Sequence, residues 1–581
     1  MRERILGWIE GGPDNSGGGE DEEEVERRDR WQRRQLVRLG DDLPDEWRER
    51  RAELLERYGE PDQRPVGRAV WSGETAPLTK EELAAKTVQE IVNYLNTWTP
   101  GDRFVGPSPE ALARLLSEVV AEDPARFAAA AERFLDVEPT YARNVVAGLA
   151  KAAWEGREFD WPPLLSFAAA SLTRPRLVES RPRHGNAFDP GWIWTRLEVA
   201  RLLSAGLEKN LIPVELADDV WALLATLAED EEPDLAYEGE WADGGMGPSG
   251  LALNSVRGAA MHAVMRYAWW HKEQTPESET PAFEPRLRAL LDRHLDPAVE
   301  PTRTVRAVYG QWFPYLVAAD SDWSAERAAA IFPLEGEQAP LGRVAWDSYV
   351  LHNRVYDSAF EQLRPQYQAA IARLAASDGD EEAPEALVGH LISLYVRAQI
   401  ELDDELLEHF FAEVSVELRG RLIELVGVDV ADADDIPPER LERLHVLLDS
   451  RLEAALAVGG EALRELRGFS WWFGSGKFDD DWSLTQLTAL LEAGGTVEFD
   501  HVVIERLNEL RETRLATVVR ALSALIDASD DPWFVLGSRG EIHTMLRAGL
   551  DSDEEAVQEI ARRATSRLIA RGHPEFRDLL Q

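Results

Sequence analysis

The chain has 581 residues, a length that can hold roughly three or four compact domains or one long repeat array. Hydrophobic residues make up 44% of it, which is enough for an ordinary buried core. It contains no cysteine, so disulfide bonds, thiolate zinc sites, cysteine-ligated iron–sulfur clusters and cysteine nucleophiles are excluded. No apolar run approaches the ~18 residues of a membrane span, and residues 1–10 are too charged for a signal peptide, so we expect a soluble, cytoplasmic protein.

The charge balance is strongly acidic, with 107 Asp and Glu against 63 Lys and Arg and a net charge of −44. Lysine is scarce, and almost all the basic residues are arginines. An excess of acid spread along the whole chain repels nucleic acid and anionic membranes, and it strains the compact state by self-repulsion. Molar salt shortens the Debye length to about 3 Å and removes most of this repulsion. The composition therefore resembles that of proteins from salt-accumulating archaea, with an acidic protein of a GC-rich bacterium as the alternative.

The first 75 residues differ in composition from the rest of the chain. Residues 1–29 combine glycine with a block of acids and cannot bury a core, which predicts a disordered linker. Residues 30–75 are charged on nearly every face, which predicts a helical lead-in of one or two exposed helices, divided at Asp42–Pro44.

From residue 76 onward, apolar residues recur at i, i+3, i+4 and i+7 in blocks of roughly 12–20 residues. The stretch 108–123, SPEALARLLSEVVAED, shows the type: Ser108 can cap a helix and Pro109 suits its first turn. Further blocks are predicted at 138–152, 192–208, 212–229, 252–271, 285–295, 301–318, 340–357, 384–400, 403–428, 438–456, 483–494, 501–527 and 553–571.

Strand signals are nearly absent, so the sequence predicts an all-α fold. Many short helices joined by short loops favour an irregular α-solenoid of HEAT-like helical pairs over a bundle. The segment 296–320, with an Asp-Pro turn before its helix, is similar to the inner helix of such a repeat. We expect the solenoid to occupy 76–430 and to continue as helical repeats through 431–581, although no fixed repeat length aligns.

The stretch 469–482, FSWWFGSGKFDDDW, invites comparison with a phosphate-binding loop. A Walker A motif needs a hydroxyl residue after its Gly-Lys pair, but Phe478 follows Gly476 and Lys477. Trp471 stands where the first glycine belongs, and no aliphatic strand precedes it. We therefore predict an aromatic loop between helices.

Other catalytic motifs are absent or lack their context. The stretch 245–250, GMGPSG, fits the dinucleotide fingerprint literally, but no strand precedes it. No lysine has an acid two residues before it, which excludes PD-(D/E)xK nucleases, and the histidines form no HExxH pattern. We assign no catalytic, cofactor-binding or metal-binding residue.

The chain has 20 tryptophans, among them WIW at 192–194 and WW at 269–270 and 471–472. Large aromatic residues often anchor interfaces, yet in an irregular array they more often fill gaps between unequal repeats. We predict packing for most of them. Trp471, Trp472 and Trp482 are the possible partner contacts if they are exposed together.

Several phrases are similar to one known group of proteins, among them LTKEELAAKTVQEIVNYLNTWTP (78–100), WIWTRLEVARLL (192–203), LNSVRGAAMHAV (253–264) and TVRAVYGQWFPYL (304–316). They resemble the C-terminal helical-repeat region of large bacterial and archaeal proteins of the anti-phage defence type. In that group an effector or NTPase portion precedes a helical array that recognises the target. This sequence lacks such a portion, so the resemblance implies a separately encoded effector and carries over no functional residue.

Taken together, these features predict a non-catalytic helical-repeat scaffold or recognition module that binds a protein partner. The resemblance implies that this module acts in an anti-phage defence system. Nucleic acid is disfavoured as a partner, and the basic runs 27–38 and 174–184 are expected to pair with acids of the chain itself. One alternative is an enzyme with an unrecognised carboxylate-lined all-α active site. A second is an acidic nucleic-acid mimic, which should concentrate its acids on one face, whereas this sequence distributes them.

Overall fold

The computed structural model describes residues 29, 31–33, 36–37, 43–59, 75–100, 107–178, 189, 191–243, 245–274, 283–376, 383–529 and 537–581. The chain divides into two compact units, Met1–Glu74 and Thr75–Gln581. The predicted linker 1–29 lies almost wholly outside the described residues. The boundary predicted between 430 and 431 falls inside a helix of the second unit.

The first unit contains helix α3, Asp45–Tyr58, which begins directly after Pro44. Leu36, Leu43 and Leu54 form a small buried cluster in this unit, so α3 has one apolar face as well as its charged ones. Arg50 on α3 pairs with the buried Asp29 at 2.6 Å.

The described part of the second unit consists of helices joined by turns and loops, and the all-α prediction is confirmed. The described residues contain no strand beyond one isolated bridge between Thr75 and Pro107. Up to residue 295 the helices are α4 Lys80–Ala84, α5 Val88–Thr97, α6 Pro109–Glu122, α7 Pro124–Ala128, η1 Ala131–Asp136, α8 Pro139–Trp154, α9 Pro162–Leu172, α10 Ile193–Glu208, η2 Val214–Leu216, α11 Ala217–Ala228, α12 Leu235–Asp243, α13 Pro248–Asn254, α14 Val256–Gln274 and α15 Pro285–Leu295.

The remaining helices continue to the end of the chain. They are α16 Arg303–Ala319, α17 Ser321–Ile331, α18 Ala339–His352, α19 Asp357–Ala376, α20 Pro384–Val396, α21 Glu405–Glu413, α22 Val416–Asp432, α23 Pro438–Val458, η3 Gly460–Leu466, α24 Phe469–Gly474, α25 Asp480–Glu492, α26 Asp500–Leu510, α27 Leu515–Ala528, α29 Arg539–Leu550, α30 Glu555–Ala570 and η4 Pro574–Leu580.

Local chemistry explains where many of these helices begin. The Ser108 hydroxyl accepts a hydrogen bond from the Ala111 N–H at 3.1 Å, and Pro109 is the first residue of α6, as predicted. The predicted block 403–428 is divided into α21 and α22, because the Ser415 side chain caps a new helix. The block 501–527 is likewise divided into α26 and α27.

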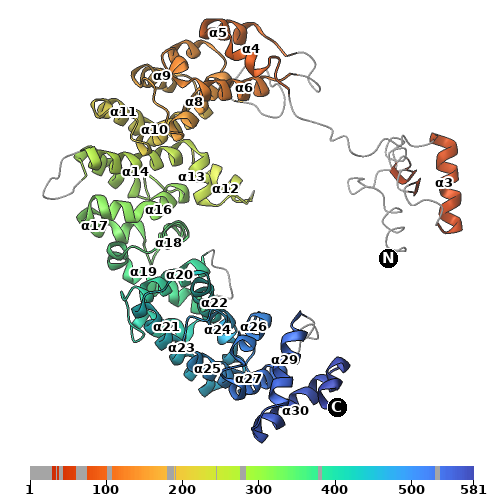
Figure 1. The fold of residues 1–581 in the computed structure, drawn as a ribbon. Helices are drawn as coiled ribbons and strands as arrows, with labels where there is room; N and C mark the ends of the chain where they lie inside the picture. Colours follow the sequence, from red (N-terminus) through yellow and green to blue (C-terminus); the bar gives the residue numbers. More distant parts are fainter. Residues whose placement is uncertain are drawn as a thin grey trace. The chain divides into compact units, whose positions relative to one another are not determined.

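The helices of the second unit pack in two series (Figure 1). In the first, α6, α8, α10, α14, α16, α18, α20, α22, α24, α26 and α29 each contact the next member. The second series has three parts, and within each part every helix contacts the next one. These parts are α9 and α11; α17, α19 and α21; and α23, α25, α27 and α30. A helix therefore packs against one that lies about two elements further along, which is the arrangement of packed helix pairs in a helical array.

Close approaches and buried arginines join these pairs. A Cβ at Gly310 of α16 would lie 1.9 Å from the carbonyl oxygen of Ala345 on α18, so only glycine allows this crossing. Arg306, 2% exposed, donates to the carbonyl oxygens of Leu295 and Ala330 at 3.1 and 2.6 Å. These bonds satisfy groups at the ends of α15 and α17.

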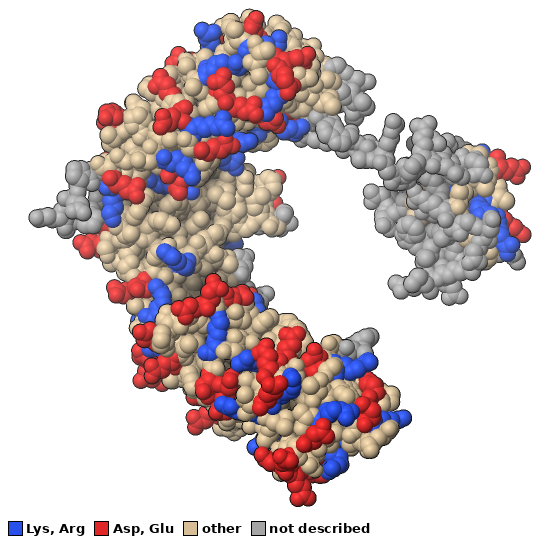
Figure 2. Space-filling model, in the orientation of Figure 1, with Lys and Arg blue, Asp and Glu red and all other residues tan. Residues whose placement is uncertain are grey.

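Tryptophans fill much of the core. Trp192, Trp270 and Trp472 are buried, and the packing interpretation is confirmed for these three. Among the described helices, none has both the length and the hydropathy required to cross a bilayer. On the face drawn in Figure 2, acidic and basic side chains are interspersed.

Candidate functional site

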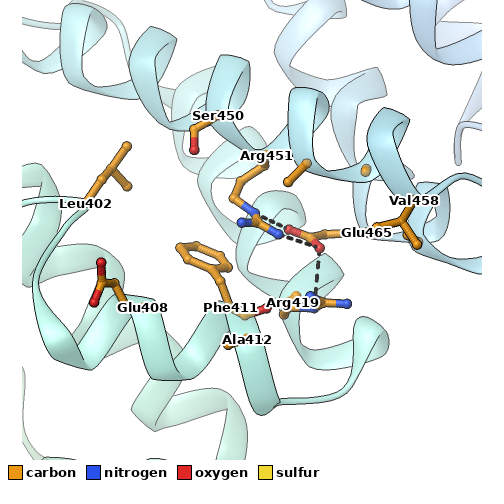
Figure 3. A pocket seen from close by; sticks show the side chains of 12 residues that line it. Leu402, Glu408, Phe411, Ala412, Arg419, Ser450, Arg451, Val458 and Glu465 are labelled. Carbon is orange, nitrogen blue, oxygen red and sulfur yellow. Dashed lines mark hydrogen bonds and ion pairs between the residues drawn. The ribbon is translucent and has the colours of Figure 1, made fainter.

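A cavity of about 480 Å³ lies between α21, α22, α23 and η3, and we refer to it as the α21–α23 cavity (Figure 3). Helix α23 contributes one stripe of its surface, because Arg451, Ala454, Ala455 and Val458 recur at helical spacing. Phe411 of α21 forms part of the opposite wall. The walls are therefore largely apolar.

One buried carboxylate lies in this cavity, held by two guanidinium groups (Figure 3). Glu465, 1% exposed, accepts from Arg451 Nε at 2.6 Å and from its Nη2 at 3.1 Å. Arg419 Nε lies 3.3 Å from the second oxygen of the same carboxylate. Two positive charges share one negative charge, so the group has a net charge of one positive.

The two arginines are themselves positioned by α21. Arg451 stacks over the Phe411 ring, with its Cζ 4.2 Å from the ring centroid. Arg419 donates from Nη1 to the carbonyl oxygen of Phe411 at 2.6 Å. Phe411 therefore helps to hold both guanidiniums beside the Glu465 carboxylate.

The cavity offers a ligand apolar walls and a fixed cationic group. Its second acid, Glu408, is exposed at the edge. Among the described residues, no group of three or more His, Asp and Glu is arranged to hold a metal ion. An apolar-walled cavity with a fixed cationic group fits an apolar side chain, or one that ends in an acid.

The three tryptophans predicted as partner contacts lie beside this region and differ in exposure. Trp472 is 0% exposed, and its Nε1 donates to the carbonyl oxygen of Ile423 on α22 at 2.8 Å. Trp482 is half-buried, and its Nε1 donates to Asp449 Oδ1 on α23 at 2.9 Å. Trp471 is half-buried, with its ring centroid 5.0 Å from that of Phe499. The three are not exposed together, so the condition for the predicted contact is not met: Trp472 lies in the core, and a partner contact by Trp471 or Trp482 stays a prediction.

The glycine-rich turn in this stretch connects α24 to α25. Gly476 has a φ of 64°, which glycine adopts without strain. Asp479 accepts from the Trp482 N–H at 2.9 Å and caps α25, so it is used in starting a helix. The stretch 245–250 is similarly the entry to α13, which begins at Pro248.

Sequence reasoning missed Arg419, Arg451 and Glu465. With 107 acids and 63 bases, no single ion pair can be chosen from the sequence. The sequence did contain one indication that Arg451 is partly buried. It directly precedes Leu452, a buried residue on the apolar face of α23.

No family model matches the chain, and no curated protein shows significant sequence similarity to it.

Proposed function

We propose that the chain is a non-catalytic helical-repeat scaffold, an irregular solenoid of HEAT-like pairs, which binds a protein partner through the α21–α23 cavity. One observation carries the proposal: largely apolar walls surround two arginines that share one buried carboxylate, which leaves one positive charge for a ligand. A cavity of about 480 Å³ falls within the range of pockets that enclose a ligand group. Val458, 79% exposed, adds apolar surface beside it.

The two alternatives have less support. An enzyme that uses carboxylates needs an acid within hydrogen-bond reach of a substrate, whereas Glu465 is 1% exposed and already pairs with two guanidiniums. A nucleic-acid mimic needs a continuous anionic face, whereas the face in Figure 2 mixes both signs. The defence-type role stays a prediction, which the identity of the neighbouring genes would test.

The test uses the full tagged chain as bait in an extract of its source organism in molar KCl. We expect one protein to be recovered with it in stoichiometric amount. Ala454→Trp fills the cavity and should abolish the capture, whereas Ala457→Trp, an exposed position on the same helix, should retain it. Recovery of the chain alone, as a stable monomer, would refute the proposal.

A further inference from the structure

A second cavity, of about 340 Å³, lies between the C-terminal parts of α10, α14, α16 and α18. Its aromatic walls face in different directions. The Trp269 and Tyr315 rings are 6.0 Å apart and nearly perpendicular, at 86°. Trp312 lies 5.0 Å from Tyr315 at 52°. Tyr315 is 41% exposed, so part of its ring is open to a ligand.

Two carboxylates at this cavity are held in place by the chain itself. Glu273 accepts from Trp269 Nε1 at 2.8 Å, which fixes one of its oxygens. Glu208 accepts from Arg266 Nε at 2.9 Å. Arg266 already pairs with Glu208, and Lys272 lies over the Trp269 ring at 5.4 Å from its centroid, so Glu273 is the acid of the cavity that has no ion pair with Arg266.

Two further groups on α18 and at its end contribute acceptors. Asn353 uses its amide nitrogen twice, donating to the carbonyl oxygens of Gln311 and Tyr349 at 2.9 and 3.0 Å, which leaves its Oδ1 as an acceptor. His352 Nδ1 lies 2.9 Å from the carbonyl oxygen of Ser348 and must donate to it, so Nε2 of the neutral ring is also an acceptor. A ligand with several hydrogen-bond donors therefore complements this cavity.

The chain already satisfies this chemistry once with a guanidinium. Arg266 lies over Trp312, with its Cζ 4.9 Å from the ring centroid, and 5.5 Å from the centroid of Trp154, and it pairs with Glu208. A planar guanidinium stacks on aromatic faces and offers five donors, whereas an ammonium group offers three from one point. An acidic ligand is disfavoured, because Glu208 and Glu273 would repel it.

We propose that this cavity binds an arginine side chain of a protein partner. The inference rests on the proposed function and adds the chemistry of the partner. The guanidinium lies against the exposed part of the Tyr315 ring, donates to the Glu273 carboxylate and reaches the Asn353 amide oxygen. A basic segment is also the complement of a chain with a net charge of −44, which would attract it over a distance at low salt.

The test measures binding of short peptides to the full chain labelled with 5-fluorotryptophan. Trp269→Phe identifies the Trp269 fluorine signal in the NMR spectrum. We expect acetyl-Gly-Arg-Gly-amide to shift this signal saturably. The same peptide with citrulline, which has the shape of arginine but no charge, should bind about tenfold more weakly, since a charge-assisted contact contributes about that factor. The lysine peptide should also bind more weakly.

Glu273→Gln should weaken binding of the arginine peptide about tenfold, while its amide oxygen can still accept from Trp269. Glu453→Gln removes one charge from the exposed surface of α23 and should leave the affinity unchanged. The proposal is overturned by equal affinity for the arginine and citrulline peptides, by no saturable shift, or by equal loss in both variants. This experiment needs no partner protein, so a chain that captures a partner but ignores the peptide refutes only this inference.

Discussion

Replacing His262 by glutamine tests how the core of α14 and α16 responds to acid. His262 is 4% exposed, and its Nδ1 accepts from Trp312 Nε1 at 2.8 Å. A second proton on the ring would take away this acceptor. Burial, followed by the nearby Arg266 and His352, lowers the pKa of His262 from 6.5 to about 3.

Because folding lowers the pKa of His262, acid favours the unfolded chain. In the unfolded chain the imidazole gains a proton as the pH falls below its ordinary pKa of about 6.5, whereas the folded chain keeps it neutral until about pH 3. The contribution of His262 to stability is therefore fully present above pH 6.5 and is lost as the pH falls. Between pH 7 and pH 5 the loss amounts to about 2 kcal/mol.

Hydrogen exchange of peptides from α14, measured for both proteins at pH 7 and pH 5, reports the free energy of local opening. Glutamine keeps an acceptor for Trp312 but does not titrate, so wild type should lose about 2 kcal/mol more than His262→Gln over this interval. Comparing two proteins at each pH cancels the titration of the many acids. His501→Gln, at an exposed position, is the matched control and should follow wild type. Identical pH profiles for wild type and His262→Gln would refute the reasoning.

Two further predictions concern packing and salt. Gly310→Ala should lower the free energy of unfolding in urea by about 1–3 kcal/mol, because the new methyl group would collide with the Ala345 carbonyl. The control is Gly389→Ala on α20, where a Cβ meets nothing within 4 Å. This variant should be neutral or raise the free energy of unfolding by up to about 1 kcal/mol. Equal effects of the two variants would contradict the close crossing of α16 and α18. The thermal unfolding temperature should rise from dilute buffer to molar KCl, because salt screens the repulsion of a net charge of −44; a flat or falling temperature would count against salt adaptation.

The helical class and many helix boundaries could be predicted because their causes are local. The spacing of apolar residues gives the period of a helix, and a side chain such as Ser108 caps the turn that follows it in the chain. The predicted block 285–295 coincides with α15, and 384–400 begins where α20 begins. The prediction failed where one apolar pattern runs on through a turn, as in 501–527, because the periodicity alone does not show that the chain reverses there.

The two candidate sites could not be predicted, because their members are far apart in sequence. Arg419, Arg451 and Glu465 come from α22, α23 and η3, and only the packing of these helices selects this trio from 170 charged residues, the sum of 107 acids and 63 bases. The cavity around Trp269 and Tyr315 likewise needs four helices to meet. Neither site contains a motif.

In the stretch 469–482, the sequence determines one property and the tertiary structure another. By itself, the sequence determined that this stretch is not a phosphate loop, because that motif depends on residue types at fixed spacing: Phe478 occupies the place of the hydroxyl. Only the tertiary structure decided which tryptophan is buried. Trp471 and Trp472 are neighbours on α24, so the helix turns them in different directions, and the packing of α22 against that helix encloses Trp472 while Trp471 stays half-exposed.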